Sequence, residues 1–203
     1  MSNLNLRLTK EIFARLFVAA TNSKMNLFSF TYYLERSKVV SVIEEKSNDE
    51  LFNKSLTDIF VSVTGHDIEN DNSYGVYNDA YWCGSSYFEL FLRTGKPFSY
   101  LFLKLPLVKM MDIYPIYHEM DISSLVMFFN NLEKEKTILR LLCKNNRCSL
   151  PKLSSATGIS LSTLSKYNAN DAALYKGSFQ NIIKIAKFFD APISLFIERL
   201  ETN

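Results

Sequence analysis

The chain has 203 residues, of which 47% are hydrophobic and 14% aromatic. That composition excludes a disordered chain and is sufficient for one core or two small domains. Only six Gly and five Pro interrupt the chain, and long runs between such breakers favour helices over a β-sandwich. The sequence therefore predicts an all-α protein.

Three cysteines are too few for a disulfide framework, so we expect reduced thiols. No run approaches the roughly 18 apolar residues of a membrane span, and the N-terminus lacks the pattern of a signal peptide. We expect a cytoplasmic protein that does not contact a membrane.

The net charge of +2 is unevenly distributed along the chain. Residues 1–132 contain 12 Lys/Arg and 15 Asp/Glu, a net charge of −3, whereas residues 133–203 contain 11 and 6, a net charge of +5. A basic segment that follows a slightly acidic domain in the chain is typical of nucleic-acid-binding proteins. We therefore divide the chain into a helical domain, 1–132, for dimerisation or partner binding, and a DNA-binding domain, 133–203.

Apolar residues at helical spacing predict a series of helices in the N-terminal domain. Thr9 is the expected N-cap of the first helix, and Pro115 the expected end of the last. Residues 39–43 fit either a short strand or a helical turn. The predicted helices cover about 9–20, 23–36, 49–64, 80–94, 98–104 and 107–114. Their aromatic residues indicate a packed core or, as an alternative, an aromatic ligand pocket.

Residues 65–79 form one long acidic loop, and loops of this length are often functional. Carboxylates alternate from Asp67 to Asp71 as in a calcium loop. Asn72 and Asn78, however, occupy the positions where that loop needs Gly and Glu. A solvated or binding loop therefore fits better than a calcium site.

Nothing in residues 1–132 has the pattern of an enzyme site, and no nucleotide-binding glycine motif is present. The segment 115–121 combines His118, Glu119 and Asp121, which fits either a metal or acid–base role or helix capping and ion pairing. We expect no enzymatic activity, no cofactor and no metal.

From Ile122 the apolar positions keep helical spacing across the charged stretch 133–136, after Asp121 as N-cap. This pattern predicts one long helix, or two nearly continuous helices, that joins the domains. No Gly/Ser linker separates them, so we expect a stiff connection.

Residues 149–189 have the layout of two short helices, a tight turn and a third packing helix. Ser149 and Ser160 are the expected N-caps, and Gly158 the expected left-handed end of the first helix. Leu153 and Ala156 are the expected inward positions of that first helix. The next helix is anchored by Leu164, and further helices start at Ser178 and Pro192. These features together predict a helix-turn-helix.

The motif Ala156-Thr157-Gly158-Ile159-Ser160, with Leu164 and the later Ile185-Ala186, resembles the Cro/C1-type repressor domain. The resemblance covers about residues 135–198 and implies a five-helix fold whose third helix enters the major groove. The turn after that helix departs from the family's usual Glu-x-Gly and carries an insertion before Gly177. The resemblance and the basic charge make the following residues the candidate DNA contacts: Lys152, Ser160, Leu161, Ser162, Thr163, Ser165, Lys166, Asn168 and Lys176.

Two functions follow from this organisation. The first is a repressor of a bacterial or mobile-element operon, dimeric on a palindrome of double-stranded DNA. The second is a protein-binding effector, such as an antitoxin or an anti-CRISPR-like inhibitor of a defence nuclease, whose helix-turn-helix represses its own operon. The helix-turn-helix used only as a packing or protein-binding module is a third alternative.

Overall fold

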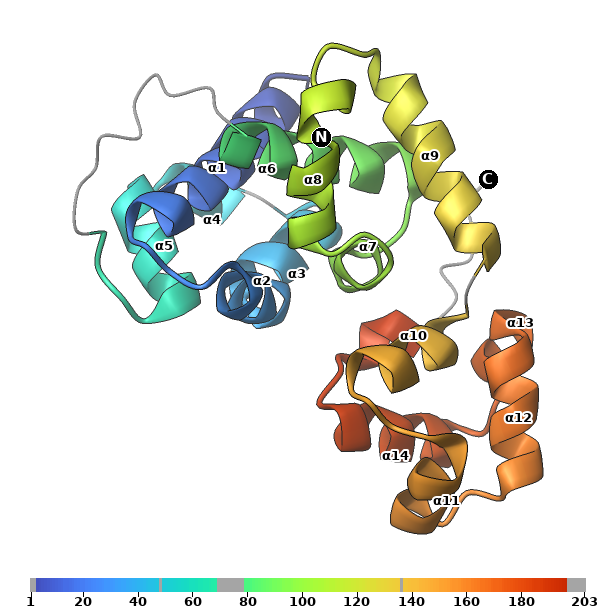
Figure 1. Ribbon diagram of the computed structural model, residues 1–203. Coiled ribbons are helices and arrows are strands. Elements are labelled where there is room, and N and C mark those ends of the chain that lie inside the picture. Colours follow the sequence, from blue (N-terminus) through green and yellow to red (C-terminus); the bar gives the residue numbers. More distant parts are fainter. Residues whose placement is uncertain (1–2, 48, 69–78, 136, 197–203) are drawn as a thin grey trace. The chain divides into compact units, whose positions relative to one another are not determined.

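The computed structural model describes residues 3–47, 49–68, 79–135 and 137–196 (Figure 1). These residues form helices and contain no strand, which confirms the predicted all-α fold. The chain divides into two compact units, Met1–Val126 and Met127–Asn203. The division falls inside α9 (Ile122–Glu135), so that one helix belongs to both units.

The first unit is a cluster of helices in which α1 lies along α6, with further contacts from α1 to α2 and α5. Its helices, together with the start of α9, are α1 (Asn3–Asn22), α2 (Leu27–Arg36), α3 (Lys38–Glu44), α4 (Asp49–Phe52), α5 (Leu56–Thr64), α6 (Asp79–Thr94), α7 (Phe98–Lys104) and α8 (Leu107–Tyr117).

Aromatic rings fill the core of this unit. Phe13 packs against Phe98 with ring centroids 4.6 Å apart, and Phe17 meets Phe30 edge-on at 5.1 Å. All four side chains and Tyr87 are buried. Large aromatic side chains dominate the burial energy of a core, so core packing is confirmed as the role of these rings.

The close approach of α1 and α6 depends on Gly84. A Cβ atom at this position would lie 2.7 Å from the Cα of Ala14 and 2.7 Å from the ring of Phe17. Both contacts are shorter than real Cβ atoms show. Glycine therefore sets the distance between the two longest helices of the unit.

Several predicted helix bounds are wrong. The run predicted as one helix over 49–64 is two helices, α4 and α5, because Ser55 caps α5, and the helix predicted from residue 23 begins at Leu27. The first helix begins at Asn3, so Thr9 does not cap it; Thr9 is buried, and its hydroxyl donates to the carbonyl of Asn5 at 2.7 Å. Such a bond to the preceding turn lets threonine lie within a helix. Pro115 lies inside α8, which continues to Tyr117 and is closed by the His118 N–H on the Tyr114 carbonyl. Proline has no N–H to donate and its ring crowds the carbonyl four residues earlier, which is why the sequence predicts a helix end there.

The ambiguous residues 39–43 are helical and belong to α3. The side chain of Ser37 accepts a hydrogen bond from the N–H of Val40 and caps the helix. Val39, Val40, Val42 and Ile43 are all buried. Tertiary burial, rather than the β propensity of valine and isoleucine, decided the conformation.

The second unit consists of α10 (Ile138–Asn145), α11 (Leu150–Thr157), α12 (Leu161–Ala169), α13 (Asp171–Tyr175), α14 (Phe179–Phe189) and the short 3₁₀ helix η1 (Ile193–Phe196) (Figure 1). Here α11 packs against α12 and α14, and α10 packs against α12. Leu139, Leu153, Leu164, Ile185 and Phe196 are fully buried between them.

The stretch that joins the units is two helices, one of the two predicted arrangements. α9 ends at Glu135, and α10 begins at Ile138. Thr137 caps α10, because its hydroxyl accepts from the N–H of Arg140 at 3.3 Å.

Within the described residues, no helix combines the length and the hydropathy needed to cross a bilayer.

Candidate nucleic-acid interface

The turn between α11 and α12 is built from local backbone chemistry. Gly158 ends α11 in the left-handed region, at a φ of 69°, and its N–H donates to the carbonyl of Ser154 at 2.8 Å. Glycine adopts this conformation without steric cost. The hydroxyl of Ser154 donates to the carbonyl of Ile159 at 2.6 Å, and the side chain of Ile159 is buried. The predicted turn is therefore present.

The face of α12 that points away from the core is polar apart from one leucine. Ser160 caps the helix by accepting the N–H of Thr163 at 3.2 Å. Leu164 and Tyr167, three residues apart, are buried. This spacing leaves the outward positions exposed, namely Leu161, Ser162, Ser165 and Lys166.

The predicted DNA-contacting residues divide by exposure into two groups. Thr163 and Asn168 are half-buried. The hydroxyl of Thr163 lies 2.8 Å from that of Ser160, and the carbonyl of Asn168 accepts from the hydroxyl of Thr137 at 2.8 Å. The exposed members are Lys152, Ser160, Leu161, Ser162, Ser165, Lys166 and Lys176. Contact of any of them with DNA remains a prediction.

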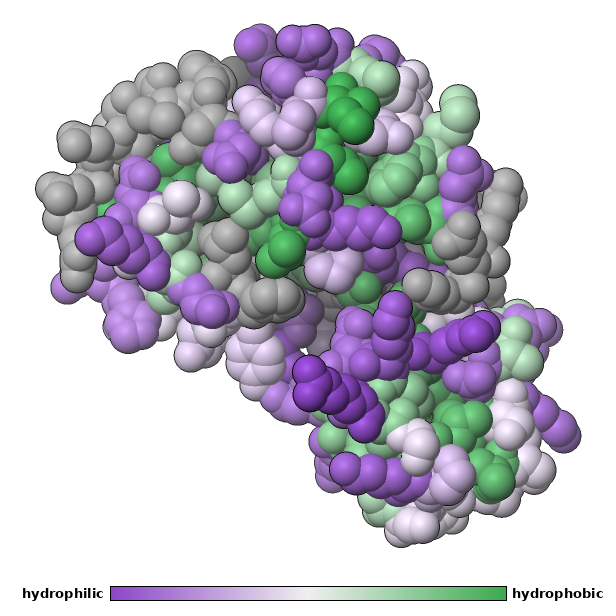
Figure 2. Space-filling model, viewed as in Figure 1, coloured by the Kyte–Doolittle hydropathy of each residue, from purple (hydrophilic) through white to green (hydrophobic). Residues whose placement is uncertain are grey.

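Three exposed lysines are available to an anionic partner. Lys152 lies on α11, Lys166 on α12, and Lys176 at the end of α13. None of them forms an ion pair with a residue that the structure describes. In the view of Figure 2, hydrophilic side chains cover much of the second unit, and apolar patches show between them. An unpaired surface lysine can neutralise a phosphate without first losing a protein partner.

One predicted core position is wrong. Ala156 is exposed, so it does not mediate the approach of α11 to its neighbours. Leu153, which is fully buried, is the inward side chain of this helix. Because α11 has only two turns before Gly158, its rotation is set by its packing partners α12 and α14 rather than by its own apolar spacing.

The insertion after α12 folds into the short helix α13. Asn170 caps it by accepting the N–H of Ala172 at 2.8 Å, and Leu174 is buried. The phenol of Tyr167 in turn accepts from the amide of Asn181 on α14 at 3.4 Å. The segment between α12 and α14 is therefore a packed part of the unit.

Sequence reasoning missed one exposed aromatic side chain. Phe179 opens α14 and is 64% exposed. Its spacing to Ile182 and Ala186, both buried, predicts an inward position, so no local signal could have identified it. Like Leu161, which is 46% exposed, it is a large apolar side chain on the surface of the unit.

The thiols of this unit pack inside it. Cys143 and Cys148 are free and buried, and the N–H of Cys148 donates to the carbonyl of Cys143 at 2.8 Å. Burial, with a smaller effect of Cys148, raises the pKa of Cys143 to about 11. A thiol with so high a pKa is a poor nucleophile and a poor metal ligand.

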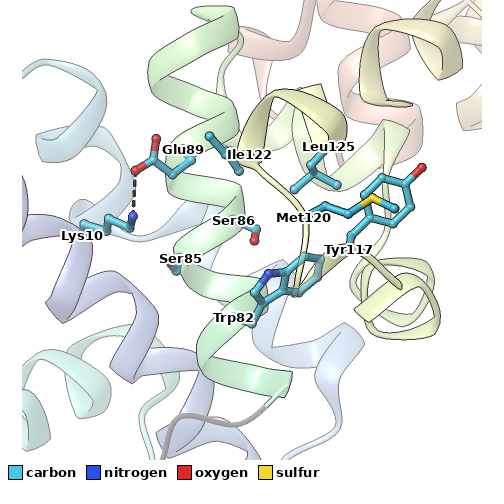
Figure 3. A pocket seen from close by; sticks show the side chains of 9 residues that line it. All are labelled: Lys10, Trp82, Ser85, Ser86, Glu89, Tyr117, Met120, Ile122 and Leu125. Carbon is cyan, nitrogen blue, oxygen red and sulfur yellow. Dashed lines mark hydrogen bonds and ion pairs between the residues drawn. The ribbon is translucent and has the colours of Figure 1, made fainter. Parts of the chain in front are cut away.

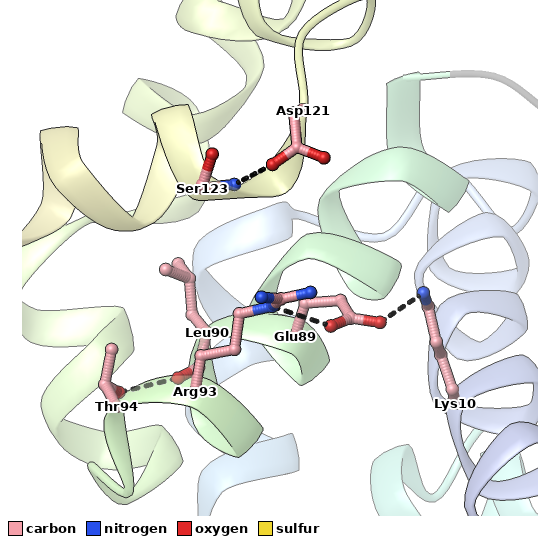
Figure 4. A network of polar contacts seen from close by, with 7 residues as sticks. All are labelled: Lys10, Glu89, Leu90, Arg93, Thr94, Asp121 and Ser123. Atoms are coloured by element: carbon pink, nitrogen blue, oxygen red, sulfur yellow. Dashed lines mark hydrogen bonds and ion pairs between the residues drawn. The ribbon is translucent and has the colours of Figure 1, made fainter.

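The two candidate sites in the first unit have different outcomes. The calcium-like alternation of residues 67–78 lies mostly outside the described residues. At the 115–121 segment, His118 Nδ1 lies 2.8 Å from the Tyr114 carbonyl and Nε2 lies 3.7 Å from Glu119. Asp121 accepts the N–H of Ser123 at 2.8 Å (Figure 4). Hydrogen bonds from the Ser123 side chain and, to a smaller extent, from this N–H lower the pKa of the Asp121 carboxyl. These contacts correspond to helix capping and ion pairing.

Comparison with known proteins supports the helix-turn-helix. Residues 132–167 match the model of a winged helix-turn-helix DNA-binding family, and the match includes α10, α11 and α12 up to Tyr167. No curated protein and no solved structure matches the chain. A wing is a β-hairpin, whereas residues 137–196 contain no strand. The C-terminal unit thus contains a helix-turn-helix of the DNA-binding kind, and short helices follow it.

Proposed function

We propose that this protein is a repressor that binds double-stranded DNA as a dimer on a palindromic operator, in a bacterial or mobile-element operon. The observation that carries the proposal is the outward face of α12, where Leu161, Ser162, Ser165 and Lys166 are exposed above a buried Leu164. The match of residues 132–167 to a DNA-binding helix-turn-helix family supports this face as the recognition surface.

We further propose a Cro/C1-like arrangement rather than a winged one. The segment after α12 leads into α14, which packs against α11, and then into η1. In the Cro/C1 resemblance, a helix with the Ile185-Ala186 pattern occupies this place, and both residues are buried. The helical continuation supports a five-helix unit with α13 as an addition.

The exposed side chains suit distinct parts of a DNA duplex. The Lys166 ammonium can donate to guanine O6 and N7 in the major groove, and serine hydroxyls bind bases or phosphates. Lys152 and Lys176 lie off the recognition helix and suit the phosphate backbone. With one cation on α12, a single copy would bind weakly. Two copies on half-sites one turn apart, about 34–36 Å, would double the contacts.

The test is selection of binding sites from random duplex DNA with the full chain, followed by affinity measurement over a range of salt concentrations. We expect a palindromic consensus and a linear fall of log K with log salt. Lys152→Ala should lower the magnitude of the slope by about one per protomer. Lys54→Ala, an exposed lysine after α4, should leave it unchanged. Failure to select any sequence, with no salt dependence, would refute the proposal.

One observation supports the second candidate function, a protein-binding effector that represses its own operon. α8 exposes apolar side chains in the first unit: Val108 is 43% and Ile116 59% exposed. A protein partner that covers α8 would remove this apolar surface from water. Co-expression with the product of the neighbouring gene tests this function. A stable complex that Ile116→Asp abolishes, while DNA binding persists, would support it.

A further inference from the structure

A pocket of about 200 Å³ opens in the first unit between α6 and the segment from the end of α8 to the start of α9. It differs from the candidate DNA-binding face in position and in chemistry. Figure 3 shows Lys10 and Glu89 on one side of the pocket and Trp82, Tyr117 and Met120 on the other. The proposed DNA-binding function uses none of these residues.

The apolar side of the pocket is aromatic and well positioned. Trp82, on α6, is the only tryptophan of the chain and is half-buried. The ring of Tyr114 packs edge-on against it, with centroids 5.5 Å apart, and holds it in place. Tyr117 and the half-exposed Met120 complete this side. A thioether and two aromatic rings form an adaptable surface for an apolar group.

The polar side consists of two opposite charges. Lys10 Nζ donates to Glu89 Oε1 at 2.7 Å, and Arg93 Nε donates to Glu89 Oε2 at 3.3 Å (Figure 4). Burial alone would raise the pKa of Glu89, but the hydrogen bonds and charges of Lys10 and Arg93 hold it below the ordinary value. Glu89 is therefore ionised at neutral pH. Lys10 has three N–H donors, and its bond to Glu89 uses one.

The two charged side chains that line the pocket, Lys10 and Glu89, restrict the class of ligand that can bind there. The Glu89 carboxylate would repel a simple anion in the pocket, and the Lys10 ammonium would repel a simple cation. A zwitterion avoids both conflicts, because its carboxylate can face Lys10 while its ammonium faces Glu89. The volume of about 200 Å³ lies below the roughly 300–1,000 Å³ typical of sites for drug-sized molecules, so the ligand is small.

We propose that this pocket binds a free α-amino acid with an apolar side chain. The charged backbone groups of the ligand pair with Lys10 and Glu89, and its side chain lies on Trp82, Tyr117 and Met120. Ile122 and Leu125 of α9 also line the pocket, and α9 continues to Glu135 shortly before the helix-turn-helix begins. The pocket and the proposed DNA-binding face use different residues. The amino-acid proposal can therefore be wrong while the operator proposal holds, and the reverse.

The fluorescence of Trp82 reports on this site directly, because no other tryptophan contributes. The full chain is titrated with L-leucine, L-methionine and L-phenylalanine, and then with 4-methylpentanoate and 3-methylbutylamine, which lack the ammonium or the carboxylate of leucine. We expect saturable changes with at least one of the three amino acids. Because each analogue makes one charge-assisted contact fewer than leucine, it should bind about tenfold or more weakly. Calorimetry repeats each titration in case the emission does not respond.

Two variants test the charged side, and a third tests the apolar side. Lys10→Met and Glu89→Gln should each weaken amino-acid binding by about tenfold or more, whereas Lys54→Met should not. Met120→Ala, at a half-exposed position, should preserve folding and weaken binding of leucine. The proposal is wrong if neither fluorescence nor calorimetry detects an amino acid at millimolar concentration. It is also wrong if either analogue binds as tightly as leucine, or if Met120→Ala has no effect.

Discussion

The carboxylate of Asp171 accepts a hydrogen bond from the backbone N–H of Ile138 at 2.7 Å, across 33 residues of chain. A second bond, from the Thr137 hydroxyl to the Asn168 carbonyl, lies next to it. Together they fasten the first turn of α10 to the end of α12 and the start of α13. The helix α13, which follows α12, therefore holds α10 in place.

Replacement of Asp171 by Asn should destabilise the second unit by about 1–2 kcal/mol, because a carboxylate at a helix N-terminus gains from both the hydrogen bond and the helix dipole. Hydrogen exchange of the Ile138 amide is the direct measurement and should become faster. Asp112→Asn, at an exposed position on α8, serves as control. If the Ile138 amide exchanges no faster in Asp171→Asn, this hydrogen bond contributes little to the stability of the second unit.

Gly158 tests the turn between α11 and α12, and Gly65, which ends α5 in the same conformation, is its matched control. Both end a helix in the left-handed region, at φ values of 69° and 72°, and neither has an atom within 4 Å of a Cβ placed there. Alanine at either position should cost about 1 kcal/mol in unfolding free energy, since only backbone strain is added. Only Gly158→Ala should also weaken DNA binding. Equal loss of DNA binding in both variants would exclude a specific role of the α11–α12 turn.

Leu161 is the one large apolar side chain on the exposed face of α12, and we expect it to contact the methyl group of a thymine. After the operator has been selected, each thymine in turn is replaced by deoxyuridine, which lacks only that methyl. One replacement per half-site should weaken binding about fourfold, the value of one buried methyl group. The variant Leu161→Ala should bind the operator and the deoxyuridine-substituted operator equally well. If the native protein tolerates every replacement, Leu161 does not read thymine.

Alanine in place of Gly84 should destabilise the first unit by about 1–3 kcal/mol, because the added methyl group has to push α1 away from α6. The clash involves the ring of Phe17 and the backbone of Ala14. A second change, Phe17→Leu, should therefore restore only part of the loss. Urea denaturation followed by Trp82 fluorescence measures both variants. If Gly84→Ala is as stable as the native protein, α1 and α6 can move apart without a loss of unfolding free energy.

The ion pairs of Glu89 predict a pH dependence of stability. Its pKa is lower in the folded protein than the ordinary value of 4.5, so its contribution is present above that pH and is lost as the pH falls through the folded value. The native protein should exceed Glu89→Gln in stability at pH 7, and the difference should shrink below pH 4.5. A difference that stays constant down to pH 3 would contradict the ion-pair assignment. Thermal unfolding at a series of pH values gives this comparison.

Features with local causes were predictable from the sequence. Ser149 and Ser160 cap their helices, Gly158 ends α11, and Leu164 anchors α12, because each of these depends on a few neighbouring residues. The all-α fold followed from the scarcity of breakers and the helical spacing of apolar residues. The exposed positions of α12 followed from the same spacing, whereas Lys152 and Lys176 entered the candidate DNA-binding set through the resemblance and the basic charge.

Features that depend on distant partners were not predictable. Ala156 is exposed because α12 and α14 set the rotation of α11, and residues 39–43 are helical because they are buried in the first unit. The bond from Asp171 to Ile138 and the meeting of Lys10, Glu89 and Trp82 join segments far apart in the chain. The sequence alone determined that the chain is helical, and it placed the caps and the turn of the helix-turn-helix. Tertiary packing decided which faces are buried and which side chains share a pocket, because burial is a property of neighbours in space.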